Sequence, residues 1–121
     1  METWGGALEN LGLKVGFWSG KRVLLTGHTG FKGSWASLML KMLGAKVHGL
    51  SLPPTGNSIF YNSVGMERRI FDSTYADISS YQACLDVVKQ CKPEIIIHMA
   101  AQPLVRESYL NPLDTYLVNV M

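Results

Sequence analysis

Short apolar runs and amphipathic segments alternate along most of the chain. The apolar runs predict strands over residues 21–26, 45–52, 69–75 and 94–99. Apolar residues at helical spacing predict helices over residues 31–43, 80–90 and 112–121. Because strands and helices alternate, we expect an α/β fold with a doubly wound parallel sheet. Right-handed crossovers give the strand order 3-2-1-4.

Local signals refine these predicted elements. Ile70 and Phe71 form the apolar part of the third strand, and Ser79 is expected to cap the helix that follows. The residues of that helix expected to face the sheet are Leu85, Val88 and Cys84. Residues 53–65 are predicted to form a polar loop, and residues 1–16 a poorly ordered tail.

Three glycines between the first strand and its helix form the main candidate site. Gly27, Gly30 and Gly33 recur every three residues, after a strand and at the start of a helix. Glycines in this context permit a tight turn, a close approach of phosphate to the backbone, and close strand–helix packing. The N–H groups at a helix start also attract anions. The motif therefore predicts a dinucleotide site, although an ordinary strand–helix turn remains the alternative.

Residues after the other strands could complete such a site. Asp77 and Ile78 could hold adenine, or Asp77 could serve only as a charge at a helix start. Ala100 and Ala101 leave room for the nicotinamide ribose, or simply pack. Asn119 could reach the cofactor or bind a neighbouring loop backbone.

The residues at the end of the second strand do not distinguish NAD from NADP as the bound cofactor. Ser51 stands where an acidic residue would mark NAD, and serine can still bond a ribose hydroxyl. No arginine follows directly, although Arg68 and Arg69 could fold back towards a 2′-phosphate. Lys32 could neutralise phosphate charge or be a solvated lysine at the helix start.

Composition narrows the class of protein. The 121 residues are 47% hydrophobic and 17% charged, with a net charge of +2, which is typical of a globular chain. No basic run indicates nucleic-acid binding, and no stretch predicts a membrane helix or a secretory signal. Cys84 and Cys91 lie too far apart on one helix for a disulfide, so we expect free thiols and a cytoplasmic location. The three histidines lie on different elements and do not predict a metal site.

Residues 17–121 are predicted to be the N-terminal part of a dinucleotide-binding domain. Such a domain has two halves, and this chain supplies one half and the next strand. The isoleucines Ile95, Ile96 and Ile97 would then lie on an unprotected edge, which complete proteins avoid. We therefore expect the front piece of a longer protein. A small domain that covers this edge by self-association is the alternative.

Three strings together resemble the CDP-glucose 4,6-dehydratase family, within the NAD-dependent epimerase/dehydratases of the extended short-chain dehydrogenase/reductase superfamily. They are FWSGKRVLLTGHTGFKGSW, GLSLPP and KPEIIIHMAAQPLVRESY. The resemblance implies a Rossmann-like fold, bound NAD, and a homo-oligomeric lyase that converts CDP-glucose to CDP-4-keto-6-deoxyglucose. It places Thr29, Phe31 and Lys32 beside the phosphate loop and Gln102 on the nicotinamide side. Arg106 and Ser108 would border the sugar.

The chain lacks the catalytic pair of that superfamily. Its Tyr-x-x-x-Lys motif is absent, because none of the five tyrosines has a lysine four positions later. We therefore expect no catalytic residue here and no activity from these 121 residues alone. A stand-alone, non-catalytic dinucleotide-binding module is one alternative. The front part of another sugar-nucleotide enzyme, such as an epimerase or a GDP-mannose dehydratase, is another.

Overall fold

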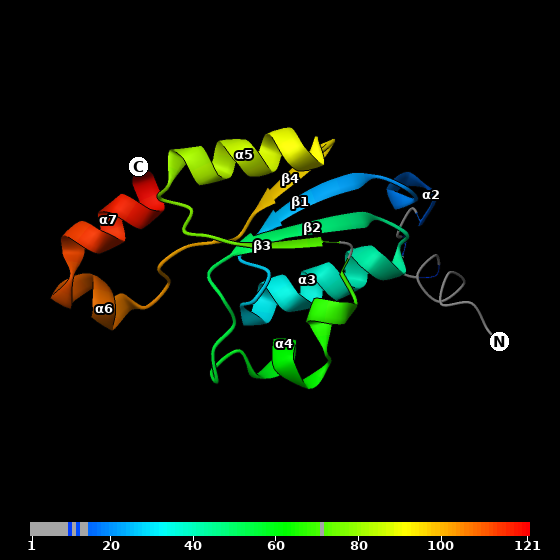
Figure 1. Ribbon diagram of the computed structural model, residues 1–121. Coiled ribbons are helices and arrows are strands. Elements are labelled where there is room, and N and C mark those ends of the chain that lie inside the picture. The colour runs from blue at the N-terminus through cyan, green and yellow to red at the C-terminus, as the bar shows by residue number, and fades with distance from the viewer. Residues whose placement is uncertain (1–9, 11, 13–14, 71) are drawn as a thin grey trace.

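A four-stranded parallel sheet forms the centre of the computed structural model, which describes residues 10, 12, 15–70 and 72–121 (Figure 1). The strands are β1 (Arg22–Thr26), β2 (Lys46–Ser51), β3 (Asp72–Tyr75) and β4 (Ile95–His98). They lie in the order β3-β2-β1-β4, and each neighbouring pair is parallel. The predicted doubly wound sheet and its strand order are therefore confirmed.

Helices cover both faces of the sheet and extend past the carboxyl ends of its strands. They are α2 (Val15–Trp18), α3 (Phe31–Met42), α4 (Ile59–Ser63), the 3₁₀ helix η1 (Met66–Arg68), α5 (Tyr81–Cys91), α6 (Val105–Leu110) and α7 (Pro112–Val120). Figure 1 shows α3 and α4 on one face and α5 on the other, with α6 and α7 beyond the strand ends. The predicted tail over residues 1–16 lies mostly outside the described residues, and the domain division stays a prediction.

Two apolar clusters sandwich the sheet. On the α3 face, the buried residues are Val23, Leu25, Leu40, Ala45 and Val47. On the α5 face, they are Leu24, Leu50 and Val87. Successive residues of β1 thus point to opposite faces and are buried on both, as expected of a parallel strand with helices on each side.

The first turns of α3 face the sheet with small residues, and Leu40 is the apolar residue of this helix buried against the sheet. Gly33, Ser34 and Ser37 are buried, whereas Trp35 is 51% exposed and stacks on Phe60 of α4 with ring centroids 4.2 Å apart. The buried serines donate back to carbonyl oxygens of their own helix, which satisfies their hydroxyls. Small side chains allow this helix to lie close to β1 and to the loop that precedes it.

The connection between β2 and β3 is more ordered than predicted. Residues 53–65 were expected to form a loop, but α4 lies within them. Tyr61, Met66 and Ile70 form a third buried cluster there, so Ile70 precedes the strand instead of belonging to it. β3 begins at Asp72, and the expected role of Phe71 lies outside the described residues.

Two details of α5 differ from the prediction. Its N-cap is Ser80, whose hydroxyl accepts a hydrogen bond from the Ala83 N–H at 3.3 Å, and not Ser79. Val87 is the buried residue of this helix, and Val88 is exposed. Cys84 does pack against the core, as expected. Both cysteines are free thiols, and burial raises the pKa of Cys91.

Candidate functional site

Gly27 ends β1 in a conformation that favours glycine. Its φ is +78°, in the left-handed region. A Cβ atom at this position would lie 2.9 Å from the Ala100 backbone nitrogen, so the turn after β1 packs directly against the chain after β4. A side chain here would therefore separate the two segments that border the candidate dinucleotide site.

Gly33 and Gly30 have different roles in the loop. A Cβ at Gly33 would lie 2.0 Å from the Gly27 carbonyl oxygen, so only glycine lets α3 pack on the turn. Gly30 has φ −74°, is exposed, and would place a Cβ within 4 Å of only the Gly27 carbonyl oxygen, at 3.3 Å. Gly30 is also the N-cap of α3 and supplies no capping side chain. The start of α3 thus offers N–H groups beside open space, which fits a pyrophosphate.

The threonine that precedes the glycines connects β1 to the chain after β4. The Thr26 hydroxyl accepts hydrogen bonds from the N–H groups of Met99 at 3.0 Å and Ala100 at 3.1 Å. It also lies 2.7 Å from Nδ1 of His98, the exposed last residue of β4. Thr26 therefore holds the start of the segment that was predicted to border the nicotinamide.

His28 fills the space beneath the glycine loop. Its ring is fully buried, stacks on Tyr75 and lies 2.6 Å from the Ser73 hydroxyl through Nε2. Nδ1 has no hydrogen-bond partner of satisfactory geometry among the described residues. Burial lowers the pKa of His28 to about 4, against a smaller opposing effect of the Leu50 backbone, so the ring is neutral at physiological pH.

Ser51 is buried at the end of β2, with its hydroxyl already engaged. It donates to the Leu52 carbonyl oxygen at 2.8 Å and shares a hydrogen bond with Thr29. With the Ser51 proton used in this way, the Thr29 hydroxyl donates to Ser51 Oγ and lies 3.1 Å from the same carbonyl oxygen. The hydroxyls of these two predicted cofactor residues are therefore bonded to each other, and they connect the glycine loop to the end of β2.

An uncharged groove of about 400 Å³ lies between the glycine loop and α4. Its lining includes Thr29, Phe31, Ser58 and Phe60. A second cavity, of about 340 Å³, has a lining that includes Arg22, the first residue of β1. This cavity therefore lies at the amino ends of the strands, away from the glycine loop. Only the first groove borders the glycine loop.

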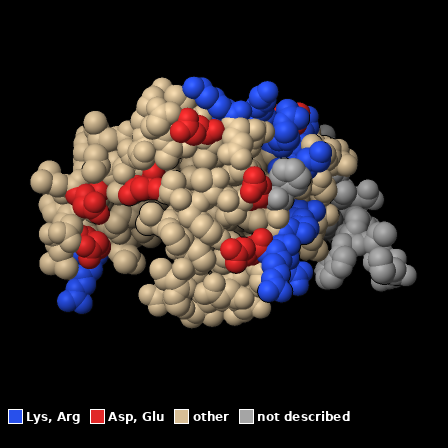
Figure 2. Space-filling view, viewed as in Figure 1, with Lys and Arg blue, Asp and Glu red and all other residues tan. Residues whose placement is uncertain are grey.

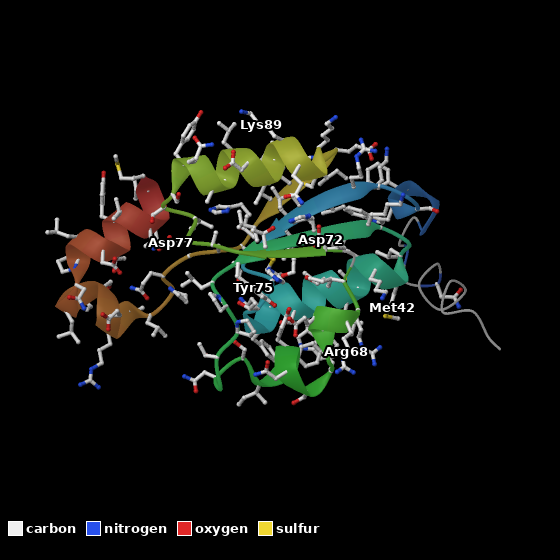
Figure 3. The ribbon with its side chains drawn as sticks, in the orientation of Figure 1. Met42, Arg68, Asp72, Tyr75, Asp77 and Lys89 are labelled. Carbon is white, nitrogen blue, oxygen red and sulfur yellow. The ribbon has the colours of Figure 1, made fainter. Side chains whose placement is uncertain are left out.

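Positive charge is sparse around the glycine loop. Lys32 is exposed on the first turn of α3. Figure 3 shows Arg68 well away from Asp77, and Arg69 donates to the Val64 carbonyl oxygen at 2.6 Å. A contact of either arginine with a 2′-phosphate stays a prediction. In the view of Figure 2, many Lys and Arg side chains gather towards the end of the molecule where the strands begin.

Asp77 lies between β3 and α5 and is exposed. Its Oδ1 accepts a hydrogen bond from the Ser79 N–H at 2.8 Å, and this bond lowers the pKa of Asp77. Ile78 packs against the cluster on the α5 face. Asp77 thus stabilises the entry to α5, as the alternative reading of the sequence held, while its role towards adenine stays a prediction.

The remaining predicted site residues lie along the chain after β4. Asn119 hydrogen-bonds the backbone of Gln102, and the Gln102 side chain bonds Thr115 and the Leu104 backbone. Ala101 is exposed. Arg106 is exposed on α6, a helix that was not predicted, and Ser108 donates within that helix to the Val105 carbonyl oxygen. The substrate roles of Arg106 and Ser108 stay predictions.

Within the described ranges, neither a cluster of metal-ligating side chains nor a helix long and apolar enough to cross a membrane is present.

Comparison with known proteins identifies the family. A family model described as GDP-mannose 4,6 dehydratase matches residues 24–121. The chain belongs to this family. The curated CDP-glucose 4,6-dehydratase of Salmonella typhimurium is 49% identical over 106 residues, which are 87% of this chain and 29% of that protein. The resemblance to CDP-glucose 4,6-dehydratases is thus confirmed, and the chain spans about 29% of the length of this relative of the family.

Solved structures share the fold. Epimerase Mth375 from Methanothermobacter thermautotrophicus is 26% identical with a TM-score of 0.69, covering 88% of this chain and 30% of that one. The UDP-Glc/GlcNAc 4-epimerase from Campylobacter jejuni is also 26% identical, with a TM-score of 0.70 and coverages of 83% and 30%. Both likenesses support the Rossmann-like sheet seen in this member of the family.

Proposed function

We propose that this chain is the NAD-binding portion of a sugar-nucleotide 4,6-dehydratase that acts on CDP-glucose. The observation that carries the proposal is the arrangement of the glycine loop. Gly27 and Gly33 bring two backbone segments together, and Gly30 leaves the start of α3 open beside them. A pyrophosphate is the group that such an arrangement accommodates best.

Different residues of the chain would bind different parts of the dinucleotide. The N–H groups at the start of α3 would hold the pyrophosphate, with Lys32 nearby for its charge. Asp77 and Ile78 would border adenine, and Ala100 the nicotinamide ribose. Bound NAD would accept a hydride from the sugar and return it within one turnover. The same fold holds NAD in the UDP-glucose 4-epimerase of Stenotrophomonas maltophila.

The choice of CDP-glucose is supported by the relative from Salmonella typhimurium, at 49% identity. The family model, described by GDP-mannose, favours a second candidate substrate of the same class. Both reactions begin by oxidation of a hexose carbon, so the cofactor site would serve either. Reading the coding DNA past Met121 and assaying any longer product with both sugar nucleotides separates the two substrates.

The 121 residues alone would not turn over a sugar nucleotide. Removal of a hydroxyl proton needs a positioned base, and the Tyr-x-x-x-Lys pair is absent from the sequence. Production of a 4-keto-6-deoxy sugar by the purified chain would contradict this part of the proposal. The chain would then contain a base that the family motif does not describe.

Calorimetric titration of the chain with NAD and ADP tests the cofactor site. Gly30→Ala is the informative variant, because its φ suits alanine and its Cβ meets only one atom, at 3.3 Å. We expect this variant to unfold at nearly the wild-type temperature and to bind NAD and ADP at least tenfold more weakly. Gly33→Ala is the matched comparison, and we expect it to lose stability, because its Cβ meets the Gly27 carbonyl at 2.0 Å.

Two outcomes would overturn the proposed site. One is a folded wild-type chain that binds neither NAD nor ADP. The other is a Gly30→Ala variant that binds both nucleotides as tightly as wild type, because the pyrophosphate could not then lie where that methyl group projects.

A further inference from the structure

We propose that Asn119 of α7 is a positioning residue that holds the segment after β4, residues 99–104 (here the β4 loop), in the shape that receives the nicotinamide half of the dinucleotide. The inference rests on the proposed NAD site. It assigns to Asn119 a role through the protein backbone, in place of the direct cofactor contact that the sequence left open.

The Asn119 side chain makes a reciprocal pair of hydrogen bonds with one residue. Its Oδ1 accepts from the Gln102 N–H at 2.7 Å, and its Nδ2 donates to the Gln102 carbonyl oxygen at 3.1 Å. Both polar ends of the amide are therefore used on both backbone groups of Gln102. An amide is the group that satisfies this pair, because it carries one acceptor and one donor side by side.

The Gln102 side chain extends the same connection. Its Nε2 donates to the Thr115 hydroxyl of α7 at 2.9 Å and to the Leu104 carbonyl oxygen at 3.2 Å, while its Oε1 accepts from the Leu104 N–H at 2.6 Å. Thr115 and Asn119 lie four residues apart, on one face of α7. Two successive turns of α7 thus hold Gln102, one through its side chain and one through its backbone.

The other end of the β4 loop is held from β1. The Thr26 hydroxyl accepts from the N–H groups of Met99 and Ala100, and Gly27 packs against the Ala100 backbone. Ala100 and Ala101 therefore lie between an anchor on β1 and an anchor on α7. The first anchor belongs to the glycine loop itself, so the two halves of the proposed site are connected through this segment.

The anchor on α7 is polar instead of apolar. No residue of α7 is buried in the described structure, and the apolar side chains of Leu113, Tyr116 and Leu117 are all exposed. The Asn119–Gln102 pair and the Thr115–Gln102 bond are therefore specific contacts in a region without a core. Losing them should change the shape of the β4 loop more than the stability of the sheet, where the apolar clusters lie.

Asn119→Leu, Asn119→Asp and the matched control Asn111→Leu test the proposal. Leucine has a similar size and no hydrogen-bonding group, and aspartate keeps the acceptor but loses the donor. Asn111 is an asparagine at the opposite end of α7 that contacts Glu107 and not the β4 loop. Each chain is titrated with NAD, which spans both halves of the site, and with ADP, which lacks the nicotinamide half.

We expect Asn119→Leu to bind NAD about tenfold more weakly, because two hydrogen bonds that shape the loop are lost. ADP should bind to it as to wild type. Asn119→Asp should show a smaller loss of NAD affinity, and Asn111→Leu should bind both nucleotides normally. Amide hydrogen exchange gives a readout without any ligand, since the Gln102 N–H should be protected in wild type and exchange faster in Asn119→Leu.

Three results would overturn the inference while leaving the proposed NAD site intact. The first is unchanged NAD affinity in Asn119→Leu, and the second is a Gln102 N–H that exchanges freely in wild type. The third is an equal loss of NAD and ADP binding with a lower unfolding temperature, which would indicate a general structural role. If the folded wild-type chain binds neither nucleotide, the proposed NAD site fails first, and the positioning role fails with it.

Discussion

His28 shows how one residue couples the glycine loop to the sheet. Its ring lies under the loop, stacks on Tyr75 of β3, and occupies the space above Gly49 of β2. A Cβ at Gly49 would lie 2.3 Å from the His28 ring, so the ring fits only because that position of β2 has no side chain. The loop and two strands are thus packed around one neutral imidazole.

Acid should destabilise the chain through His28. Its pKa is about 4 in the folded state and 6.5 for the free side chain, so the unfolded chain binds the extra proton between these values. The stabilisation is complete above pH 6.5 and is lost as the pH falls towards 4. The loss is at most about 3.5 kcal/mol, since one pKa unit is worth about 1.4 kcal/mol.

Urea unfolding at a series of pH values measures this dependence. His28→Asn should flatten the curve between pH 6.5 and 4. Burial also lowers the pKa of His48, which will leave some slope in the variant. Identical slopes in wild type and His28→Asn would show that folding does not lower the pKa of His28.

Gly49→Ala should destabilise the chain by about 1–3 kcal/mol, because the new methyl group overlaps the His28 ring. The double variant His28→Ser/Gly49→Ala should be more stable than the sum of the single effects, since the smaller side chain removes the clash. Equilibrium unfolding of the four proteins measures the coupling. Gly16→Ala is the control, because a Cβ there has no neighbour within 4 Å. If the two single substitutions have additive effects on the free energy of unfolding, the Gly49→Ala methyl group does not clash with the His28 ring.

At the scale of elements, the N-termini of α3 and α5 differ in how they are capped. α3 has a glycine at its N-cap and leaves its first turn open, whereas α5 begins at a serine that caps it. The first arrangement suits an anion, and the second suits a purely structural helix. The two helices therefore begin differently although both follow a parallel strand.

Ser80→Ala should lower the free energy of unfolding by about 1 kcal/mol, because the Ala83 N–H loses its acceptor. Ser79→Ala is the matched control, and it should cost less, since the Ser79 backbone N–H keeps its bond to Asp77. Thermal or urea unfolding of both variants gives the comparison. A larger effect at Ser79 would restore the cap position that the sequence suggested.

At the scale of the molecule, the two edges of the sheet differ. The side chains of Tyr61 in α4 and Tyr75 in the edge strand β3 share a hydrogen bond at 3.0 Å, which connects this strand to a neighbouring helix. β4 forms the other edge, and Ile96 on it is 55% exposed. Open apolar edges template pairing between chains.

We expect the isolated chain to self-associate as its concentration rises through the micromolar range, because β4 offers an open, apolar edge. Ile96→Lys should reduce the association, since charged side chains disfavour edge pairing. Sedimentation velocity at several concentrations measures both chains. A wild-type chain that stays monomeric at every concentration would mean that this edge does not mediate association in solution.

Local patterns were sufficient for the sheet and for the glycine loop. The apolar runs located β1, β2 and β4, and the predicted third segment overlaps β3 although Ile70 precedes that strand. Right-handed crossovers then gave the strand order. The same holds for Gly27, whose φ of +78° favours glycine, and for Gly33, whose Cβ would meet the nearby Gly27 carbonyl oxygen. These features depend on residues close together in the chain, so the amino-acid sequence determined them by itself.

Contacts between distant segments were decided only by the tertiary structure. Gly33, Ser34 and Ser37 turned out to face the sheet together with Leu40, because the close approach of α3 to the turn at Gly27 leaves room only for small side chains in the first turns of the helix. Asn119 turned out to face Gln102, 17 positions earlier, and His28 to lie on Ser73, 45 positions later. Hydrogen bonds and packing across such separations depend on where the folded backbone places each group, which no local pattern specifies.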